Sequence, residues 1–393
     1  MRRDHTVELL QSGAAFFPAL IAAIDAGVSE VRLETYIFHF DATGIEVAQA
    51  LESAAQRGVK VYLVMDGIGT PLVPPEWAQR FTSAGVLWHQ FSPLGTFGLL
   101  IPGRWRRMHR KLCVVDSSVM FCGGINVLDD FFELGHGIQT TPRFDFAVRV
   151  TGSLVADSHH AMVQFWQRLA VTRQLEKWNL VAARRAMRKP TAPARINPVE
   201  TGHVAASLVL RDNVRNRRRI ERVYCQAIAH ARTEVLIANA YFLPGEKLRR
   251  ALLHATQRGV KVKLLLQGKY EYFMQFHTTK AFYKELTQAG IEIYEYHAAY
   301  LHAKVAVIDG RWATVGSSNL DPLSLLLARE ANVVVEDEVF AARLHQALEL
   351  AIAEQSVRME EQAMEGRPFI QKCKDKLAFM LMRLTLFLTG RDY

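Results

Sequence analysis

The residues best suited to chemistry in this chain occur as two copies of one short pattern. The first copy reads His109-Arg-Lys111-Leu-Cys-Val-Val-Asp116, and the second reads His302-Ala-Lys304-Val-Ala-Val-Ile-Asp309. At the same distance after each copy comes a turn of small residues that ends in asparagine, Gly123-Gly-Ile-Asn126 and Gly316-Ser-Ser-Asn319. A pattern that recurs in the same context, once in each half of the chain, predicts a duplicated half-site whose members work as a pair.

Each copy predicts a strand that presents a histidine and a lysine together. Residues two apart on a strand project from the same face, so His109 and Lys111 point together, as do His302 and Lys304. The spacing therefore places an imidazole beside an ammonium group in each half.

The aspartates at the end of each copy are expected to end the strand and begin a turn. Asp116 and Asp309 lie an odd number of residues after the histidines, so on a continuous strand they would face the other way. Asp309-Gly310 is a strong hairpin dipeptide and lies between the apolar runs 304–308 and 312–315. A returning strand is therefore expected after each copy.

The returning strands would bring polar residues back to the histidines. In the second half, Ser317 and Asn319 would lie beside His302, within a residue or two of register. By the same folding, Asn126 would lie beside His109. Each half is then expected to bring an imidazole, an ammonium group and an amide together at one point.

Those groups suit a phosphodiester. Lysine and asparagine side chains can hold the non-bridging oxygens and offset the charge that builds in the transition state. One neutral imidazole can attack phosphorus and become a phospho-histidine, while the other, protonated, gives its proton to the leaving oxygen and later takes one from the acceptor alcohol. Histidine can play both parts because its usual pKa, about 6.5, lies close to neutral pH.

Each imidazole also needs a hydrogen-bond acceptor that orients it. Asp145 and Glu330 open the next apolar strand in their respective halves and are the predicted orienting residues. The two halves are not equivalent, since the first has Gly124 where the second has Ser317. The first half therefore lacks one hydroxyl donor.

At these residues the chain resembles the phospholipase D superfamily, whose signature is His-x-Lys followed by four residues and Asp. The resemblance covers nearly the whole chain and is greatest to the bacterial cardiolipin synthases, in particular the shorter B-type form without amino-terminal membrane spans. The narrower resemblance rests on Asp212-Asn-Val-Arg-Asn-Arg-Arg-Arg-Ile-Glu221, Ala240-Tyr-Phe-Leu-Pro-Gly245 and Asn319-Leu-Asp-Pro-Leu-Ser324.

The resemblance implies a phosphatidyltransferase that needs no metal and no organic cofactor. One phosphatidylglycerol would pass its phosphatidyl group to a histidine and release glycerol, and a second would accept the group to give cardiolipin. The resemblance favours His109 as the nucleophile, and the alternative, with His302 as the nucleophile, stays open. The residues assigned to catalysis are His109, Lys111, Asp116, His302, Lys304 and Asp309, and those assigned to the substrate phosphate are Asn126, Ser317 and Asn319.

The duplication extends beyond the two motifs and predicts the fold. Ala50-Leu51 with the run 56–61 returns as Ala251-Leu252 with the run 257–262, in each case as strand, helix, glycine, strand. The predicted strands are 31–38 and 235–242, and the predicted helices begin near Gly44 and Gly245 and end just before Gly58 and Gly259. The pattern favours an α/β fold of two phospholipase D-like α/β/α domains, each a mixed sheet flanked by helices, with the active site at their interface.

The predicted boundaries follow the polar, proline-bearing stretch in the middle of the chain. We expect a first domain at 1–183, a basic linker at 184–204, a second domain at 205–366 and a basic and apolar tail at 367–393. Of 393 residues half are hydrophobic, which is enough for two ordinary cores. The four cysteines show no ligand-like spacing, and we expect reduced core residues in a cytosolic protein.

Charge and apolar segments predict where the protein works. A net charge of +9 favours an anionic partner, for which both membrane lipid and nucleic acid qualify. The apolar, glycine-rich loop 91–107 favours lipid, as exposed apolar patches tend to mark interaction sites. The run 14–24 is predicted to be a helix packed on the sheet, and neither a signal peptide nor a membrane span. The tail 377–388 has two open interpretations, a helix in the membrane interface or a helix on the protein's own core.

These features predict a peripheral protein on the cytoplasmic face of a bacterial membrane, with phosphatidylglycerol as donor and acceptor. Nucleic acid is the less favoured partner, although the basic runs 184–189 and 211–222 fit it almost as well. The first rival is a hydrolase of the same superfamily, a phospholipase D or a nuclease. The second is a basic binding module without catalysis.

Overall fold

The computed structural model describes residues 1–93, 105–176, 202–212, 216–271, 273–321, 328–360 and 369–388. In the first half the strands are arranged, in spatial order, as β4 (Leu87–Phe91), β3 (Lys60–Asp66), β2 (Glu30–Thr35), β6 (Lys111–Val115), β7 (Val119–Gly123), β10 (Phe146–Thr151) and β1 (Arg2–Gln11). The first three run parallel and the others pair antiparallel, so this half has a mixed sheet.

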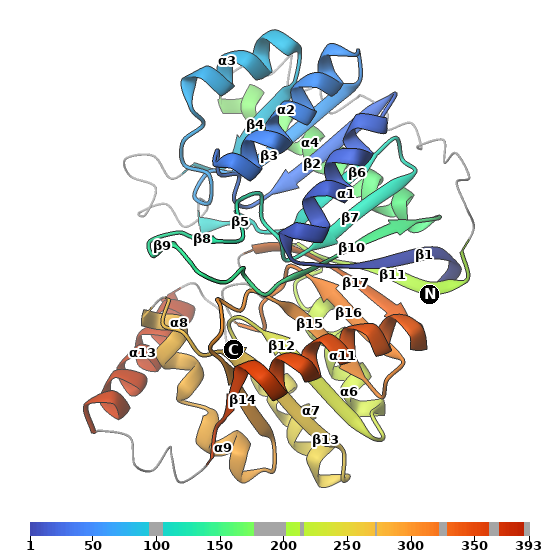
Figure 1. Ribbon diagram of the computed structural model, residues 1–393. Coiled ribbons are helices and arrows are strands. Elements are labelled where there is room, and N and C mark those ends of the chain that lie inside the picture. Colours follow the sequence, from blue (N-terminus) through green and yellow to red (C-terminus); the bar gives the residue numbers. More distant parts are fainter. Residues whose placement is uncertain are drawn as a thin grey trace.

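The second half repeats this order strand for strand. It consists of β14 (Glu292–Tyr296), β13 (Lys261–Gln267), β12 (Glu234–Asn239), β15 (Lys304–Ile308), β16 (Trp312–Gly316), β17 (Ala328–Glu336) and β11 (Val204–Arg211), with β18 (Ser356–Arg358) added at the outer edge. β1 pairs antiparallel with β11, which joins the two halves into one continuous sheet (Figure 1). The duplication read from the sequence is thus a duplication of the fold.

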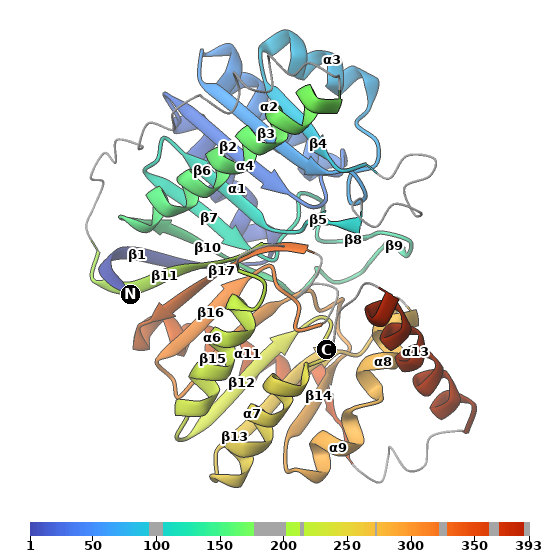
Figure 2. The same ribbon diagram turned by 180° about the vertical axis from the view of Figure 1, so that it is seen from behind.

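Helices cover both faces of each half-sheet. In the first half α1 (Ser12–Ala26), α2 (Ala42–Gln56) and α3 (Pro75–Ala84) lie on one face and α4 (Leu154–Glu176) on the other (Figures 1 and 2). In the second half α6 (Arg219–His230), α7 (Glu246–Gln257) and α9 (Tyr283–Gln288) accompany the sheet on one side and α11 (Glu338–Gln355) on the other (Figure 2). This is the α/β/α layering that the sequence predicts, so the fold class is confirmed.

Strand alternation divides the apolar residues among the layers. In β6, Cys113 and Val115 face the core that α1, α2 and α3 cover. Leu112 and Val114 face a second core, to which α4, α11 and strands of both halves contribute. This shared core packs the halves against each other.

The local signals at the turns are confirmed. Gly58 and Gly259 follow α2 and α7 with φ of +91° and +83°, the left-handed conformation that ends a helix and that glycine adopts without strain. Asp309 and Gly310 have φ of 51° and 63°, as the tight hairpin between β15 and β16 requires. The predicted first helix is α1, and its buried residues contribute to the first-half core.

Several predictions fall on parts of the chain that lie outside the described residues. These are most of the linker 184–204 with its basic run 184–189, residues 94–104 of the apolar loop, and the ends of the tail 367–393. The domain boundaries therefore stay predictions. Within the described ranges, no helix combines the length and the apolar character needed to cross a bilayer.

The cysteine prediction is wrong for one residue. Cys113 and Cys122 are buried in β6 and β7, and Cys225 is half-buried. Cys373 is exposed, because it lies on the outer side of a helix, α13 (Phe369–Leu388), that the sequence leaves open to two interpretations.

Candidate active site

The main chain of each motif histidine is bound to the other half of the protein. β5 (Arg107–Met108) runs parallel to the start of β17, and the His109 N–H donates to the carbonyl of Arg329 at 3.0 Å. In the equivalent position the His302 N–H donates to the carbonyl of Phe144 at 2.9 Å. Two strand segments thus cross between the halves and carry the histidines to the interface.

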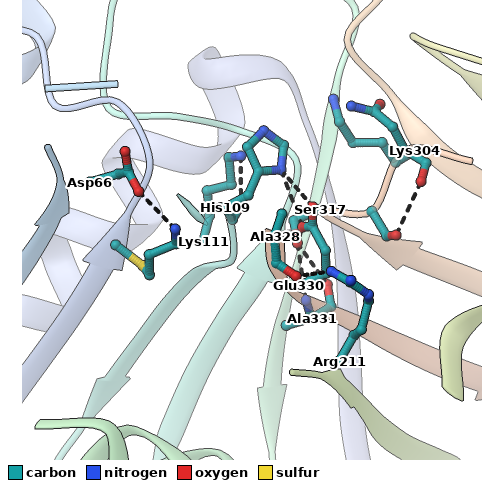
Figure 3. Close-up of polar contacts among 12 residues, drawn as sticks. Asp66, His109, Lys111, Arg211, Lys304, Ser317, Ala328, Glu330 and Ala331 are labelled. Carbon is teal, nitrogen blue, oxygen red and sulfur yellow. Dashed lines mark hydrogen bonds and ion pairs between the residues drawn. The ribbon is translucent and has the colours of Figure 1, made fainter. Parts of the chain in front are cut away.

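The side chains follow the same crossed arrangement. His109 Nδ1 lies 3.0 Å from Glu330 Oε1, and Glu330 belongs to the second half (Figure 3). His302 Nδ1 lies 2.6 Å from Asp145 Oδ2, which belongs to the first half. Each carboxylate directly follows the residue whose carbonyl holds the histidine main chain. The structure thus brings together both predicted imidazoles with both predicted orienting residues, each pair spanning the interface.

Two residues that sequence reasoning missed hold the segments leading to the histidines. Asp66 accepts a hydrogen bond from the Met108 N–H at 2.7 Å and one from the Arg107 guanidinium at 2.9 Å. In the second half, Gln267 Oε1 accepts from the Leu301 N–H at 3.2 Å. Asp66 and Gln267 are the last residues of β3 and β13. Their equal position in the repeat was the signal that could have identified them.

The motif lysines lie beside the histidines, as their spacing predicts. Lys111 Nζ donates to the carbonyl of His109 at 2.8 Å, and Lys304 Nζ donates to the carbonyl of His302. Burial lowers the pKa of Lys111 to about 7, and the charge of Lys304 acts in the same direction. Burial also lowers the pKa of Lys304 to about 8. An anionic group bound by these lysines would raise their pKa values and so favour their charged forms.

Burial acts on the acid and base groups as well. It lowers the pKa of His109, with Glu330 opposing the shift, and it lowers the pKa of His302 well below its usual value, where the charges of Lys304 and Lys111 add to the effect. Burial raises the pKa of Asp145 to about 7. The two histidine–carboxylate pairs therefore differ in their electrostatics.

The residues beside the two carboxylates also differ, since Ser317 contacts Glu330 and Gly124 lies against Asp145. Ser317 Oγ donates to Glu330 Oε2 at 2.5 Å and accepts from the Ala331 N–H at 3.0 Å (Figure 3). At Gly124 an added Cβ would lie 2.2 Å from Asp145 Oδ1, so only glycine leaves room for that carboxylate. Ser317 was expected to bind the substrate phosphate, but its fully buried hydroxyl is committed to Glu330.

The motif aspartates lie away from the histidines, at the far ends of β6 and β15. Asp309 accepts hydrogen bonds from the N–H groups of Arg232, Thr233 and Glu234 at 2.9, 2.8 and 3.0 Å and from the Thr233 hydroxyl at 2.8 Å. Asp116 makes the same set of contacts with the segment 28–30. This arrangement pins each turn to the start of β2 or β12, and the catalytic assignment of the aspartates stays a prediction.

Strand pairing places the two asparagines of the motif turns near the start of each motif strand. Lys111 pairs with Gly123, three residues before Asn126, and Val305 pairs with Val315, four residues before Asn319. Asn126 Oδ1 accepts from the Ile37 N–H at 3.1 Å, whereas Asn319 Oδ1 is buried without a partner among the described residues. Both side chains are nearly inaccessible to bulk solvent.

One group of side chains has the composition of a metal site, far from the histidines in the fold. Glu234, His345 and Glu349 bring one ligand atom each within 4.8 Å of one another. Lys263 Nζ already lies 3.0 Å from Glu234 and 2.6 Å from Glu349. The Lys263 ammonium group therefore lies where a metal cation would bind. These ion pairs join α11 to the sheet.

The arrangement at the interface can perform phosphoryl transfer. Since each Nδ1 is engaged by a carboxylate and neither Nε2 has a partner among the described residues, Nε2 can attack phosphorus or carry a proton. The motif lysines, each bound to the carbonyl of its own histidine, can supply positive charge for a phosphate group.

Comparisons with known proteins identify the family. A family model described as "Cardiolipin synthase, PLD-like domain" matches residues 20–136 and 224–351. The chain is 37% identical to Cardiolipin synthase B of Salmonella typhi over 383 residues, which are 97% of this chain and 89% of that protein. It is 36% identical to Cardiolipin synthase B of Escherichia coli (strain K12) over 382 residues, with the same coverage.

Solved structures support the fold. Phosphatidylserine synthase of Haemophilus influenzae Rd KW20 superposes with a TM-score of 0.67 at 12% identity, over 98% of this chain and 94% of that one. Polyphosphate kinase of Porphyromonas gingivalis superposes with a TM-score of 0.57 at 13% identity, over 96% of this chain and 53% of that one. The resemblance stated from the motifs is confirmed, and this chain belongs to the cardiolipin synthase family of phospholipase D-like enzymes.

Proposed function

We propose that this chain makes cardiolipin from two molecules of phosphatidylglycerol. The observation that carries the proposal is the crossed arrangement of the imidazoles, in which His109 is held by Glu330 and His302 by Asp145 across one interface. Two oriented imidazoles, each with a buried lysine beside it, suit a double displacement at phosphorus. The 36% to 37% identity to Cardiolipin synthase B proteins over nearly the whole chain supports the same reaction.

In the first step one imidazole Nε2 attacks the phosphorus of the donor lipid. The phosphorus–nitrogen bond forms as the bond to glycerol oxygen breaks, and the second imidazole, protonated, gives its proton to the departing glycerol. In the next step the now neutral second imidazole removes the proton of a terminal hydroxyl on the acceptor lipid. That oxygen attacks phosphorus, the phosphorus–nitrogen bond breaks, and cardiolipin leaves. This chemistry requires no metal and no organic cofactor.

The other site residues receive roles from their contacts. Lys111 and Lys304 would bind the non-bridging phosphate oxygens, with Asn126 and Asn319 as neighbouring amides. Ser317 would orient Glu330. Asp116 and Asp309 would hold the hairpin turns that fix the motif strands.

The donor and acceptor and the place of work belong to the same proposal. A lipid substrate resides in a bilayer, so the enzyme would act as a peripheral protein on the cytoplasmic face of the membrane. The net charge of +9 favours the anionic surface that phosphatidylglycerol provides.

A product assay tests the proposal. Purified protein is incubated with phosphatidylglycerol vesicles in the presence of EDTA, and lipids and free glycerol are followed by mass spectrometry. We expect cardiolipin and glycerol in equal amounts from the wild type and neither from His109→Ala or His302→Ala. Phosphatidic acid in place of cardiolipin would make the protein a hydrolase, and absence of any lipid product would refute the proposed substrate.

A further inference from the structure

The helix α13 presents two different faces. Its inner face packs on the second half, where Asp375, Ala378 and Met382 are buried. His277 Nδ1 lies 2.7 Å from Asp375 Oδ1, and the rings of Phe282 and Phe379 meet edge to face at 5.5 Å. The interpretation of the tail as a helix on the protein's own core therefore describes this face.

The outer face of α13 is also apolar. At about 100° per residue, one stripe opposite the buried side contains five exposed residues, which we call the outer stripe. It consists of Ile370, Cys373, Leu377, Met380 and Leu381. Ile370 is 68% exposed and Met380 is 59% exposed, so the stripe presents a large apolar area to solvent.

Lysines border the outer stripe on both sides. In the same helical projection, Lys374 falls at one edge and Lys376 at the other, and both are exposed. The only acidic residue of α13 is Asp375, which is buried against His277. A second copy of the helix would bring lysines against lysines, whereas an anionic surface complements them.

The position of α13 joins the outer stripe to the candidate active site. The helix lies against α8 (Phe273–Lys280), on the same side of the molecule as β5 and the hairpin of β8 (Phe132–Glu133) and β9 (Gly137–Ile138) (Figures 1 and 2). β5 leads directly into His109. Ile138 of that hairpin is 87% exposed, and Phe131, the residue before it, is 46% exposed, so apolar side chains face solvent there too.

We propose that the outer stripe of α13 is a membrane-docking surface that lies in the interface of an anionic bilayer while the inner face stays on the protein. The apolar stripe would enter the boundary between head groups and acyl chains, and the two lysines would bind the head groups. The surface would bring the site to a lipid substrate without any part of the chain crossing the bilayer. This proposal rests on the proposed function for its substrate but not for its test.

The native thiol on the stripe supplies the first readout. In a Cys225→Ser background, where Cys113 and Cys122 are buried, Cys373 is labelled with an environment-sensitive fluorophore. Vesicles of phosphatidylcholine and phosphatidylserine, which lack the proposed substrate, should shift its emission to shorter wavelength. An unchanged spectrum would overturn the docking surface. A shift that instead follows protein concentration without lipid would assign the stripe to a second copy and also overturn it.

Variants give the second readout. Leu377→Gln with Met380→Gln should weaken partition onto these vesicles about tenfold, since two apolar side chains that would move from water into the bilayer are replaced by polar ones. The matched control is Val339→Gln with Leu350→Gln on α11, where the replaced side chains are 64% and 55% exposed, and it should bind like the wild type. Lys374→Glu with Lys376→Glu should weaken binding to anionic vesicles by roughly tenfold or more and change binding to neutral ones little.

Activity separates this proposal from the proposed function. On short-chain phosphatidylglycerol dissolved as monomers, the stripe variants should turn over like the wild type. If the wild type makes no cardiolipin but the stripe variants lose binding, the docking surface stands and the proposed reaction fails. If the wild type makes cardiolipin and the stripe variants bind vesicles as well as the α11 control does, the docking surface is refuted.

Discussion

His109 and Glu330 form a pair across the two halves of the protein, with Nδ1 and Oε1 3.0 Å apart although the residues are 221 positions apart in the chain. The main chain makes the same crossing, because the His109 N–H is bound by the carbonyl of Arg329. Neither half therefore contains an oriented imidazole by itself. We therefore expect that neither half alone catalyses the reaction.

The crossed pairs predict which imidazole each carboxylate controls. Glu330→Gln should lower the pKa of His109 further, since the charge of Glu330 opposes the effect of burial, and it should leave the titration of His302 nearly unchanged. We expect kcat to fall on the order of a hundredfold, because the imidazole loses its orienting charge. Histidine NMR titration measures the pKa values.

The control for this variant lies on the same strand. Glu336 is exposed at the other end of β17, and Glu336→Gln should change neither the titration nor kcat. If Glu330→Gln shifted His302 and spared His109, the crossed pairing would be wrong.

The two histidines should differ in what accumulates when each is removed. With a labelled donor lipid, the variant that lacks the nucleophile should form no labelled enzyme, and the variant that lacks the proton carrier should trap the phosphatidyl group on the remaining imidazole. Intact-protein mass spectrometry of His109→Ala and His302→Ala distinguishes them. Label on both variants would refute the division of roles.

Replacing Gly124 or Ser317 by alanine should lower kcat by different amounts. Gly124→Ala forces a Cβ toward Asp145 Oδ1, so that carboxylate must leave His302, and we expect kcat to fall on the order of a hundredfold. Ser317→Ala removes one charge-assisted hydrogen bond to Glu330 and should reduce kcat about tenfold.

A buried serine elsewhere supplies the control. Ser158 is fully buried, and its hydroxyl has no partner among the described residues, so Ser158→Ala should leave kcat unchanged. Equal loss in the Ser158 and Ser317 variants would mean that the effect comes from packing and not from Glu330.

The motif aspartates should affect stability more than chemistry. Asp309→Ala deletes four hydrogen bonds at a partly exposed turn, and we expect the free energy of unfolding to fall by about 2 kcal/mol. Although partial burial acts to raise it, hydrogen bonds from Thr233, Glu234 and Arg232 hold the pKa of Asp309 below its usual value. The stabilisation is thus fully present above the usual pKa of aspartate and is lost as pH falls through the lowered pKa of the folded state.

Urea unfolding at two pH values checks this assignment. At neutral pH the midpoint should fall for Asp309→Ala while kcat per folded molecule stays near that of the wild type, and in acid the difference in midpoint should shrink. A large loss of kcat at an unchanged midpoint would return Asp309 to the chemistry.

Local patterns were sufficient to predict the strand of each motif, the hairpin turn at Asp309 and the helix ends at Gly58 and Gly259. These features depend on side-chain alternation and on the conformations that glycine allows, which neighbouring residues determine. The equal spacing of the two copies also predicted that His109 and His302 act as a pair.

The crossed pairing could not be predicted in the same way. Asp145 and Glu330 were identified as orienting residues, but which histidine each one contacts depends on how β5 leaves its own half to run beside β17. That path is set by the shared core and by the pairing of β1 with β11, contacts between residues far apart in the chain. The contact of Ser317 with Glu330 could not be predicted for the same reason, since it appears only once the strands are in register.

The perturbed groups of the site predict a narrow pH range for activity. The pKa of Asp145 is raised to about 7, so below that pH its carboxyl becomes protonated and loses the charge that holds His302. The pKa values of Lys111 and Lys304 are lowered to about 7 and about 8, so the empty site loses the charge of Lys111 above pH 7 and that of Lys304 above pH 8. We therefore expect kcat/KM to be greatest near pH 7 and to fall about tenfold per pH unit on either side for each group that titrates.

A conservative variant assigns the alkaline side of this profile. In Lys304→Arg the guanidinium stays protonated, so the fall above pH 8 should become less steep or move to higher pH, although the larger group will lower the maximum rate. Measuring kcat/KM on short-chain monomeric phosphatidylglycerol keeps the charge of a vesicle surface out of the result. If the alkaline limb were the same in the wild type, Lys111→Arg and Lys304→Arg, the lysines would not be the groups that titrate, and the phosphate would be bound by other charges.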